Sequence, residues 1–261
     1  MNKTYKILVV VAVVAVVAVV ATVFYPRPPS SFMRFGEMQI GKGEVGVLFL
    51  GDSAFVLKTS NHAIIVDPAA KVSSDAVRAL GKVNAILITH EHSDHFVASA
   101  TLELYRASDA VVVANKGVYP DLKGSIQRTD KLIELEPGET TAIDGIIVEA
   151  IASNHSGLSP VMYMISMDNI TILHASDSGF SPSLERYVGK IDIALLPTGS
   201  PSPTASPSQA FKMTATLRPK KVIPMHGSSV EYSEFRRLLA NSPGVSLVEV
   251  PELNPQKVSV P

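Results

Sequence analysis

The sequence predicts an α/β protein in which two β-sheets pack face to face and helices cover the outside. Two observations support this fold class. Beyond residue 43, short apolar runs typical of strands are interspersed with amphipathic helical patterns. The second half of the chain then repeats the style of the first, as expected for two similar sheets. The 261 residues suffice for one large domain or two small ones.

The first half contains five predicted strands, several of them apolar throughout, as in strands that are covered on both faces. They span 43–52, 53–59, 62–68, 84–89 and 110–114. Two helices are predicted between them, over 73–82 and 96–106. The first helix has Ser73 or Ser74 as its N-cap and Gly81 near its end.

The second half contains seven predicted strands, of which the first pair flanks a Pro-Gly turn and the second pair forms a hairpin. They span 131–140, 144–153, 161–167, 169–176, 192–197, 220–227 and 245–250. Helices are predicted over 206–218, which begins with Ser-Pro, and over 231–240. The Ser/Pro-rich stretch 199–209 is predicted to be a flexible surface loop.

The N-terminal segment is uncharged from Ile7 to Tyr25, which is about 28 Å of helix against ~30 Å of hydrocarbon in a bilayer. Lys3 and Lys6 precede it, so the positive-inside rule leaves the N-terminus in the cytoplasm. We expect 1–25 to be a single transmembrane helix or a cleaved signal segment, 26–43 a linker and 44–261 the functional domain. The domain would be membrane-anchored and extracytoplasmic, or secreted after cleavage.

Composition excludes several kinds of site. The chain has no cysteine, which excludes disulfides, Cys-ligated zinc, iron–sulfur clusters and a Cys nucleophile. The formal net charge is −1, without the clustered basic residues of a nucleic-acid interface, so a nucleic-acid partner is not expected. Composition does not predict the oligomeric state.

The stretch THEHSDHF, residues 89–96, has a composition typical of a metal site. Its six positions from His90 to His95 contain three histidines and two carboxylates, directly after a buried strand. In an extended loop, side chains two residues apart point the same way, so His90 and His92 can bind one ion. Asp94 and His95 lie further along and can face a second ion. Imidazole and carboxylate ligands suit zinc, and also manganese or iron.

Two ions need more ligands than this stretch supplies. His155, Asp177 and His226 each follow a predicted strand and precede a glycine within a few residues. This is the pattern expected if several strand ends converge on one site. Two other histidines are less informative, since His174 is expected either behind the ligands or inside the fold, and His62 on the surface.

These motifs resemble the metallo-β-lactamase superfamily over about residues 44–250. The likeness consists of an Asp that closes an early strand in VDP, the THxHxDH motif, an isolated His, an Asp in a turn like Gly-Asp-Thr, and a late His. The stretches GDSAFVLKT, IIVDP, DIALLPTG and RPKKVIPMHG most resemble the ascorbate-6-phosphate lactonase-like branch of simple metal-dependent hydrolases. The resemblance implies a four-layer αβ/βα sandwich with the site at one edge of the two sheets.

The resemblance also implies a role for each residue. One metal would be held by His90, His92 and His155, the other by Asp94, His95 and His226, and Asp177 would bridge them. Asp67 would hydrogen-bond the histidine loop from behind and fix its orientation. Asp94 and Asp177 are the predicted catalytic residues, which would orient the attacking water or carry its proton. The implied cofactors are two divalent ions, zinc first, with manganese or iron as alternatives.

Two departures from the family pattern bear on function. Ser176 stands where a glycine is usual, so the path of the Asp177 turn could differ. Gly51-Asp52 stands where many relatives have Gly-His, and Asp52 is therefore expected on the substrate side. The predicted function is metal-dependent hydrolysis of a small ester, lactone or phosphoester. Two alternatives stay open: a non-catalytic metal-binding or sensing protein, and an RNA- or phosphodiester-cleaving enzyme.

Overall fold

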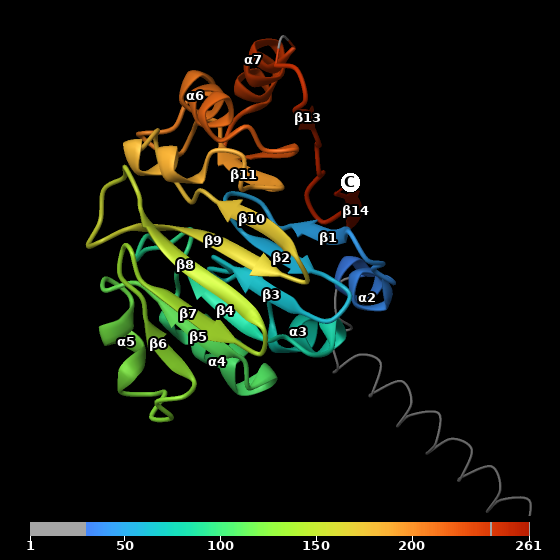
Figure 1. Ribbon diagram of the computed structural model, residues 1–261. Coiled ribbons are helices and arrows are strands. Elements are labelled where there is room, and N and C mark those ends of the chain that lie inside the picture. The colour runs from blue at the N-terminus through green and yellow to red at the C-terminus, as the bar shows by residue number, and fades with distance from the viewer. Residues whose placement is uncertain (1–29, 241, 261) are drawn as a thin grey trace, which may run out of the picture.

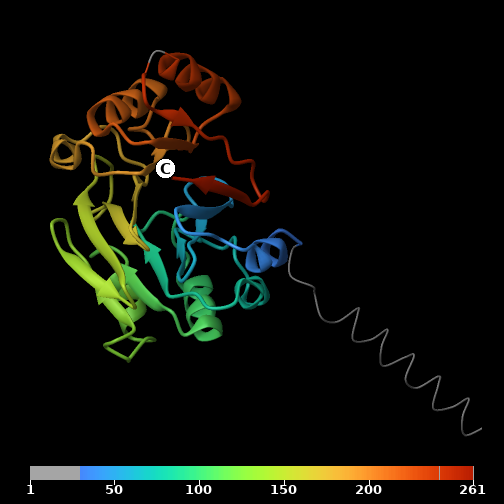
Figure 2. The same ribbon diagram turned by 45° about the vertical axis from the view of Figure 1, so that its right-hand side comes forward.

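The computed structural model describes residues 30–240 and 242–260. Within them the chain forms two seven-stranded sheets that lie face to face. Helices cover the outer face of each sheet, so that four layers follow one another, as Figures 1 and 2 show. The predicted two-sheet α/β architecture is confirmed.

The first sheet is built mainly from the first half of the chain, in the order β14-β1-β2-β3-β4-β5-β6. Its strands are β1 (Glu44–Phe49), β2 (Phe55–Lys58), β3 (Ala63–Val66), β4 (Ala85–Ile88), β5 (Val111–Ala114), β6 (Leu132–Glu134) and β14 (Gln256–Ser259). The strands from β14 to β3 pair antiparallel, and those from β3 to β6 pair parallel.

The second sheet has the same design, in the order β13-β12-β11-β10-β9-β8-β7. Its strands are β7 (Thr140–Ile143), β8 (Ile146–Ala152), β9 (Val161–Met167), β10 (Ile170–His174), β11 (Ile193–Pro197), β12 (Lys221–Met225) and β13 (Ser246–Leu247). Antiparallel pairs run from β7 to β10 and parallel pairs from β10 to β13. The similarity of the two halves expected from the sequence is therefore present.

One helix precedes β1 and the others connect parallel strands, and the caps expected at Ser73 and Ser206 are present. They are α2 (Ser30–Glu37), α3 (Ser74–Leu80), α4 (Ala98–Ser108), α5 (Tyr119–Lys123), the 3-10 helix η1 (Pro182–Tyr187), α6 (Pro207–Leu217) and α7 (Ser229–Leu239). Helix α3 begins after Ser73, whose hydroxyl accepts a bond from the backbone of Ala76, and it ends at Gly81 with φ 81°.

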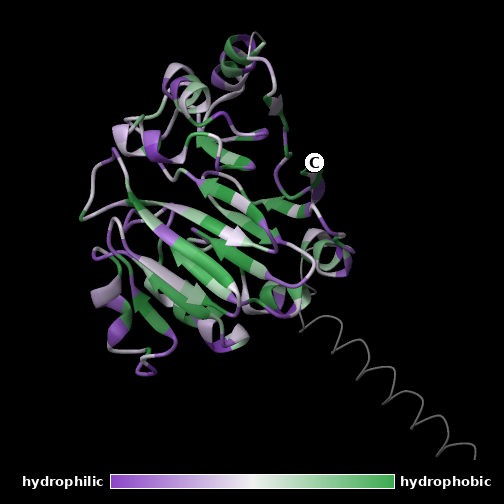
Figure 3. Ribbon diagram, viewed as in Figure 1, coloured by the Kyte–Doolittle hydropathy of each residue, from purple (hydrophilic) through white to green (hydrophobic). Residues whose placement is uncertain are grey.

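The main core lies between the two sheets and extends beneath helices α6 and α7 of the second sheet, and a second core lies between the first sheet and its helices. Along β1, Val47 and Phe49 point into the main core, and Leu48 points to the helices. This explains why the strand is apolar at successive positions, because both of its faces are covered. In Figure 3 the strands at the centre are accordingly hydrophobic, while the loops and the outer helix faces are polar.

Part of the segment predicted to be a linker, 26–43, is folded. Helix α2 lies in it and buries Phe32 and Phe35 completely against the first sheet and α3. At Gly36 the helix approaches α3 so closely that an added Cβ would lie 2.0 Å from the carbonyl oxygen of Ala79. The Lys58 ammonium donates to the carbonyl oxygens of Gly36 (2.7 Å) and Met38 at the end of the helix. The Pro-rich spacer before α2 conceals this short amphipathic helix in the sequence.

Of the helices in the described residues, none has the length and apolarity needed to cross a bilayer. The longest have 11 residues, which is about 17 Å against ~30 Å of hydrocarbon. The predicted membrane-anchored, extracytoplasmic location is therefore corrected, since the described residues contain no element that supports it, and it is withdrawn. Residues 1–25, for which the transmembrane helix was predicted, lie outside the described residues.

The C-terminal region also differs from expectation. The strand predicted over 245–250 is reduced to the two residues of β13. A strand that was not predicted, β14, follows it and pairs with β1 of the first sheet. Only Val258 of β14 is buried, so the sequence lacks a clear alternation of apolar and polar residues at this edge strand.

If α2 is part of the domain, Phe35→Ala should lower the free energy of unfolding by about 3–5 kcal/mol, because it leaves a cavity beneath the helix. Met33 lies in the same helix but is 43% exposed. Met33→Ala should therefore change stability by no more than about 0.5 kcal/mol. Urea denaturation of both variants measures the difference, and equal effects would contradict the assignment of α2 to the core.

Candidate metal centre

All seven predicted ligands come together at one edge of the two sheets, where the parallel strands end. His90, His92, Asp94 and His95 follow β4, and the other three follow strands of the second sheet: His155 after β8, Asp177 after β10 and His226 after β12. They form two groups, in each of which the potential ligand atoms lie within 4.8 Å of one another. The first group is His90, His92 and His155, and the second is Asp94, His95, Asp177 and His226.

In the first group three ring nitrogens converge. His90 Nε2 lies 3.0 Å from His92 Nδ1, which in turn lies 3.2 Å from His155 Nε2. In the second group Asp177 Oδ1 lies 2.7 Å from His226 Nε2 and 3.0 Å from His95 Nε2. Asp94 Oδ2 completes this group at 3.6 Å from His95 Nε2 and 3.9 Å from His226 Nε2.

The carboxylate of Asp177 lies between the two groups. Its Oδ1 faces His95 and His226, and its Oδ2 lies 3.9 Å from His155 Nε2 in the first group. The Ser53 hydroxyl donates to Oδ1 at 3.1 Å and helps to fix the carboxylate. One oxygen is thus available to each group.

The donor set fits divalent metal ions. His95 Nε2 and His226 Nε2 face each other at 3.5 Å, and two unprotonated ring nitrogens cannot hydrogen-bond to each other. A cation between them would use both lone pairs. Imidazole nitrogens together with carboxylate oxygens are ligands typical of zinc, manganese or iron.

The buried carboxylate of Asp67 orients this loop from behind, where the resemblance placed it. Its oxygens accept the backbone N–H and the hydroxyl of Thr89, at 2.8 and 2.7 Å. His95 Nδ1 lies 2.8 Å from Asp67 Oδ2, so this nitrogen carries a proton and Nε2 is the ring nitrogen that faces the site.

Hydroxyl groups orient two other histidines, and these contacts were not predicted from the sequence. His90 Nδ1 lies 3.1 Å from the Thr89 oxygen, whose own proton goes to Asp67, so the ring nitrogen is the donor. His155 Nδ1 lies 3.3 Å from Thr204 Oγ1, which donates to the carbonyl of Asp177 at 2.8 Å. In both histidines Nε2 is therefore free to bind a metal.

Thr204 lies in the Ser/Pro-rich stretch 199–209, which was predicted to be a flexible surface loop. Ser202 in the same stretch is 6% exposed and donates to the Asp177 carbonyl at 2.7 Å. The prediction is wrong for this part of the stretch, since it is bonded to the turn that carries Asp177. Serine and threonine are so common in loops that their presence alone could not indicate these contacts.

Several turns at the site have left-handed backbone conformations. Asp67, Ser176 and His226 have φ of 47°, 52° and 41°. Ser176 thus adopts the conformation for which a glycine would be suited, and its hydroxyl donates to Thr89 Oγ1 at 2.8 Å. The serine keeps the turn in place at the cost of backbone strain, which is typical of functional sites.

The site favours positive charge at its second group. Burial alone would raise the pKa of Asp177, but contacts with His226 and His95 hold it well below its usual range. Burial alone would lower the pKa of His95, but the carboxylates of Asp67 and Asp177 raise it to about 10. Burial lowers the pKa of His90 to about 3, and the positive charge of His95 acts in the same direction. The carboxylates of Asp67 and Asp177 thus favour a positive charge at this place, which a bound cation would supply.

Asp52 was expected on the substrate side. It also lies beside His226, one of the predicted metal ligands. Its Oδ1 is 4.0 Å from His226 Nδ1, and its other oxygen pairs with the Lys71 ammonium. A cavity of about 360 Å³ adjoins these residues. It is lined by Phe49, Gly51, Asp52, Ser200, His226, Gly227, Tyr232, Val250, Pro251 and Glu252.

The remaining histidines stay outside the ligand groups. His174 is fully buried inside the fold, where its Nε2 bonds to the Ser53 carbonyl at 2.8 Å. His62 is only partly exposed, and its Nε2 lies 2.8 Å from the Asp144 carbonyl. His62 was predicted to lie on the surface, and it lies at the strand ends that are farthest from the metal centre.

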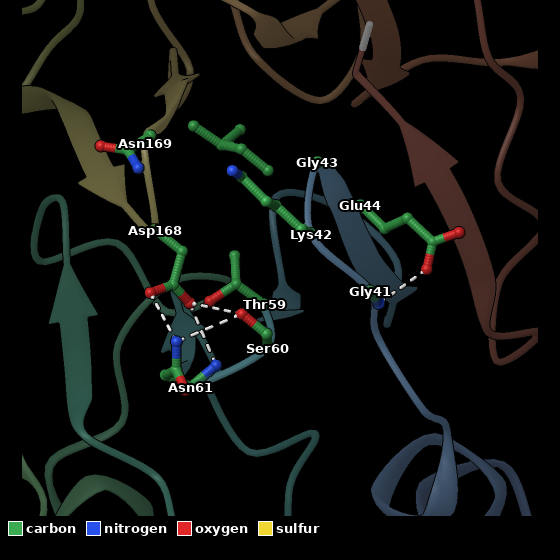
Figure 4. Close-up of a pocket in the computed structure, with 10 residues that line it drawn as sticks. Gly41, Lys42, Gly43, Glu44, Thr59, Ser60, Asn61, Asp168 and Asn169 are labelled. Atoms are coloured by element: carbon green, nitrogen blue, oxygen red, sulfur yellow. Dashed lines mark hydrogen bonds between the residues drawn. The ribbon is translucent and has the colours of Figure 1, made fainter.

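A second hollow, of about 260 Å³, lies at those opposite ends, beside the β2–β3 and β9–β10 turns (Figure 4). Its Asp168 carboxylate turns to Asn61 and Ser60, which occupy both of its oxygens. Neither potential metal-binding group of the described residues includes a residue of this hollow. We therefore expect catalysis at the other edge of the sheets, where the seven predicted ligands lie.

Comparisons with known proteins agree with this geometry. A family model described as the beta-lactamase superfamily domain matches residues 46–226. A UPF0173 metal-dependent hydrolase of Thermococcus kodakarensis is 33% identical over 224 residues, which cover 78% of this chain and 96% of the relative. One of Thermus thermophilus is 31% identical over 196 residues, covering 70% of this chain and 83% of the relative.

Among solved structures, Igni18, a novel metallo hydrolase from Ignicoccus hospitalis, matches with a TM-score of 0.70. The match covers 83% of this chain and 99% of that chain at 24% identity, which shows the shared fold alone. The family model and the curated relatives show family membership in addition to the fold, because they share sequence with most of the chain. The chain therefore belongs to the metallo-β-lactamase superfamily, as a metal-dependent hydrolase.

Proposed function

We propose that this hydrolase uses two divalent metal ions to cleave a small ester or lactone. The position of Asp177, with one carboxylate oxygen toward each ligand group, is the observation that carries the proposal. His90, His92 and His155 would hold one ion, Asp94, His95 and His226 would hold the other, and Asp177 would be shared by both. Zinc suits this donor set first, with manganese or iron as alternatives.

A pair of such ions supplies Lewis acidity and lowers the pKa of a bound water. The residues of the chain supply orientation and proton transfer. Asp94 is the more accessible of the two proposed catalytic carboxylates, with a side chain that is 32% exposed. It can accept the proton of the attacking water and pass it to the leaving group. Asp177 is 4% exposed and held by Ser53, which suits a fixed position rather than proton exchange with solvent.

The cavity beside His226 is the proposed substrate site. Its volume of about 360 Å³ is at the small end for ligand pockets, which run from roughly 300 to 1,000 Å³. Phe49, Val250 and Pro251 give it an apolar wall. Burial raises the pKa of Tyr232 to about 12, so its hydroxyl keeps its proton and can donate to a substrate oxygen.

The charges around this cavity bear on the substrate class. Asp52 and Glu252 contribute carboxylates to its wall. Asp52 is paired with the Lys71 ammonium, so it is chiefly the Glu252 carboxylate that an anionic phosphoester would meet and that an uncharged ester or lactone would not. The same charges disfavour a polyanionic RNA substrate. Of the three substrate classes expected from the sequence, we therefore propose esters and lactones as substrates in preference to phosphoesters. The assignment to the lactonase-like branch stays a prediction.

The full chain, loaded with zinc and freed of excess metal, should contain two ions by elemental analysis and hydrolyse p-nitrophenyl acetate. Asp177→Asn should lower the metal content. It should also reduce kcat by more than ~100-fold, which is the largest loss expected when a residue that only orients a metal ligand is replaced. Near-normal turnover in this variant would exclude the bridging role. Two bound ions without turnover of any ester or lactone would favour the non-catalytic alternative.

Thr204→Val should weaken binding of the ion at the first group by about 10–100-fold, because His155 loses the acceptor for its Nδ1 proton. Thr204→Ser keeps the hydroxyl and is the matched control, which should bind metal like the original chain. Competition with a chelator measures both. Equal affinities in the two variants would contradict a role for the 199–209 stretch in orienting His155.

Glu252→Lys should increase kcat/KM for p-nitrophenyl phosphate relative to p-nitrophenyl acetate, by about two- to tenfold for a partly screened charge. The two probes share a leaving group and differ in charge. Glu234→Lys makes the same charge change at an exposed position of α7 that does not line the cavity. If Glu234→Lys shifts the ratio as much, the cavity is not where the substrate charge is sensed.

A further inference from the structure

Three histidines of the centre have a partner for the ring nitrogen that faces away from the proposed ions. For His95 it is Asp67 at 2.8 Å, for His90 it is Thr89 at 3.1 Å, and for His155 it is Thr204 at 3.3 Å. A metal-bound imidazole donates its other N–H, and the acceptor sets the tautomer and the orientation of the ring.

Of the remaining two histidines, His92 is partly exposed, so that water can accept its ring proton, but this is not so for His226. Its side chain is fully buried, and its Nδ1 has no hydrogen-bond partner. When Nε2 binds a metal, Nδ1 must carry a proton, and this proton then needs an acceptor in a place that water does not reach. A carboxylate oxygen, Oδ1 of Asp52, lies 4.0 Å from this nitrogen.

The contacts of Asp52 leave one of its carboxylate oxygens, Oδ1, able to move toward His226. Its backbone carbonyl accepts the N–H of His226 at 3.2 Å, so the two residues are fixed to each other through the main chain. Its Oδ2 pairs with the Lys71 ammonium. The free Oδ1 needs to approach His226 Nδ1 by only roughly 1 Å to reach hydrogen-bond distance.

We propose that Asp52 is the positioning residue of His226, with Lys71 as its anchor. The inference rests on the proposed metal centre, because His226 needs a proton acceptor at Nδ1 only when Nε2 is a ligand. The second ion would then be bound by two histidines that are each supported by a carboxylate, His95 by Asp67 and His226 by Asp52. This arrangement makes both imidazoles stronger electron-pair donors to the metal.

The test compares Asp52→Leu with Asp52→Asn in the full chain. Leucine removes the acceptor at similar volume, and the amide oxygen of asparagine still accepts the ring proton. Asp75→Leu is the matched control, because Asp75 is also 40% exposed and also pairs with a basic side chain, but lies away from the centre on α3. His226→Ala is the reference for full loss of this ligand.

We expect Asp52→Leu to weaken zinc binding at the position that His226→Ala abolishes, by about 10–100-fold in a chelator competition. Asp52→Asn should keep most of the affinity, and Asp75→Leu all of it. In the zinc-loaded protein, NMR should show a solvent-protected His226 ring N–H, which Asp52→Leu loses. Thermal unfolding of the metal-free variants separates these effects from a general loss of stability.

Zinc affinity in Asp52→Leu equal to that of Asp75→Leu, or an equal loss in Asp52→Leu and Asp52→Asn, would overturn the positioning role. Neither readout uses turnover. A chain that binds zinc normally but cleaves no ester would therefore contradict the proposed function and leave this inference standing. A chain with a single ion would contradict the dinuclear centre, and the comparison with His226→Ala would still decide the role of Asp52.

Discussion

The buried carboxylate of Asp67 is the contact on which the geometry of the centre depends. It accepts two hydrogen bonds from Thr89 and one from His95, and so joins the end of β3 to the loop after β4. The Thr89 hydroxyl then accepts a bond from Ser176 of the second sheet. This chain of hydrogen bonds crosses from one sheet to the other, so the two halves of the centre are placed relative to each other by groups that are not themselves ligands.

This arrangement joins the folding of the domain to the chemistry of its edge. Carboxylates and imidazoles that are fixed close together repel or desolvate one another unless a proton or a cation lies between them. The high pKa of His95, about 10, reflects a proton in that position. A metal ion would replace the proton, and its binding energy would then stabilise the fold as well as the site.

Sequence analysis predicted the seven residues that the structure brings into two groups, because each follows the end of a strand, and the resemblance implied the position of Asp67. It missed contacts that depend on the path of the chain. Thr204 and Ser202 lie in a stretch whose composition is that of an ordinary loop, and Asp52 meets His226 across more than 170 residues of sequence. Helix α2 has only eight residues and follows a Pro-rich spacer, so its pattern was too short to distinguish from a linker.

The pairing of β14 with β1 has a consequence for the synthesis of the protein. Glu44 pairs with Ser259, so the edge of the first sheet is completed by residues that leave the ribosome some two hundred positions later. Until then, β1 exposes a row of unpaired backbone groups beside hydrophobic residues, which is a template for pairing with another chain. During synthesis the first half would therefore expose an edge at which chaperone binding prevents wrong pairing.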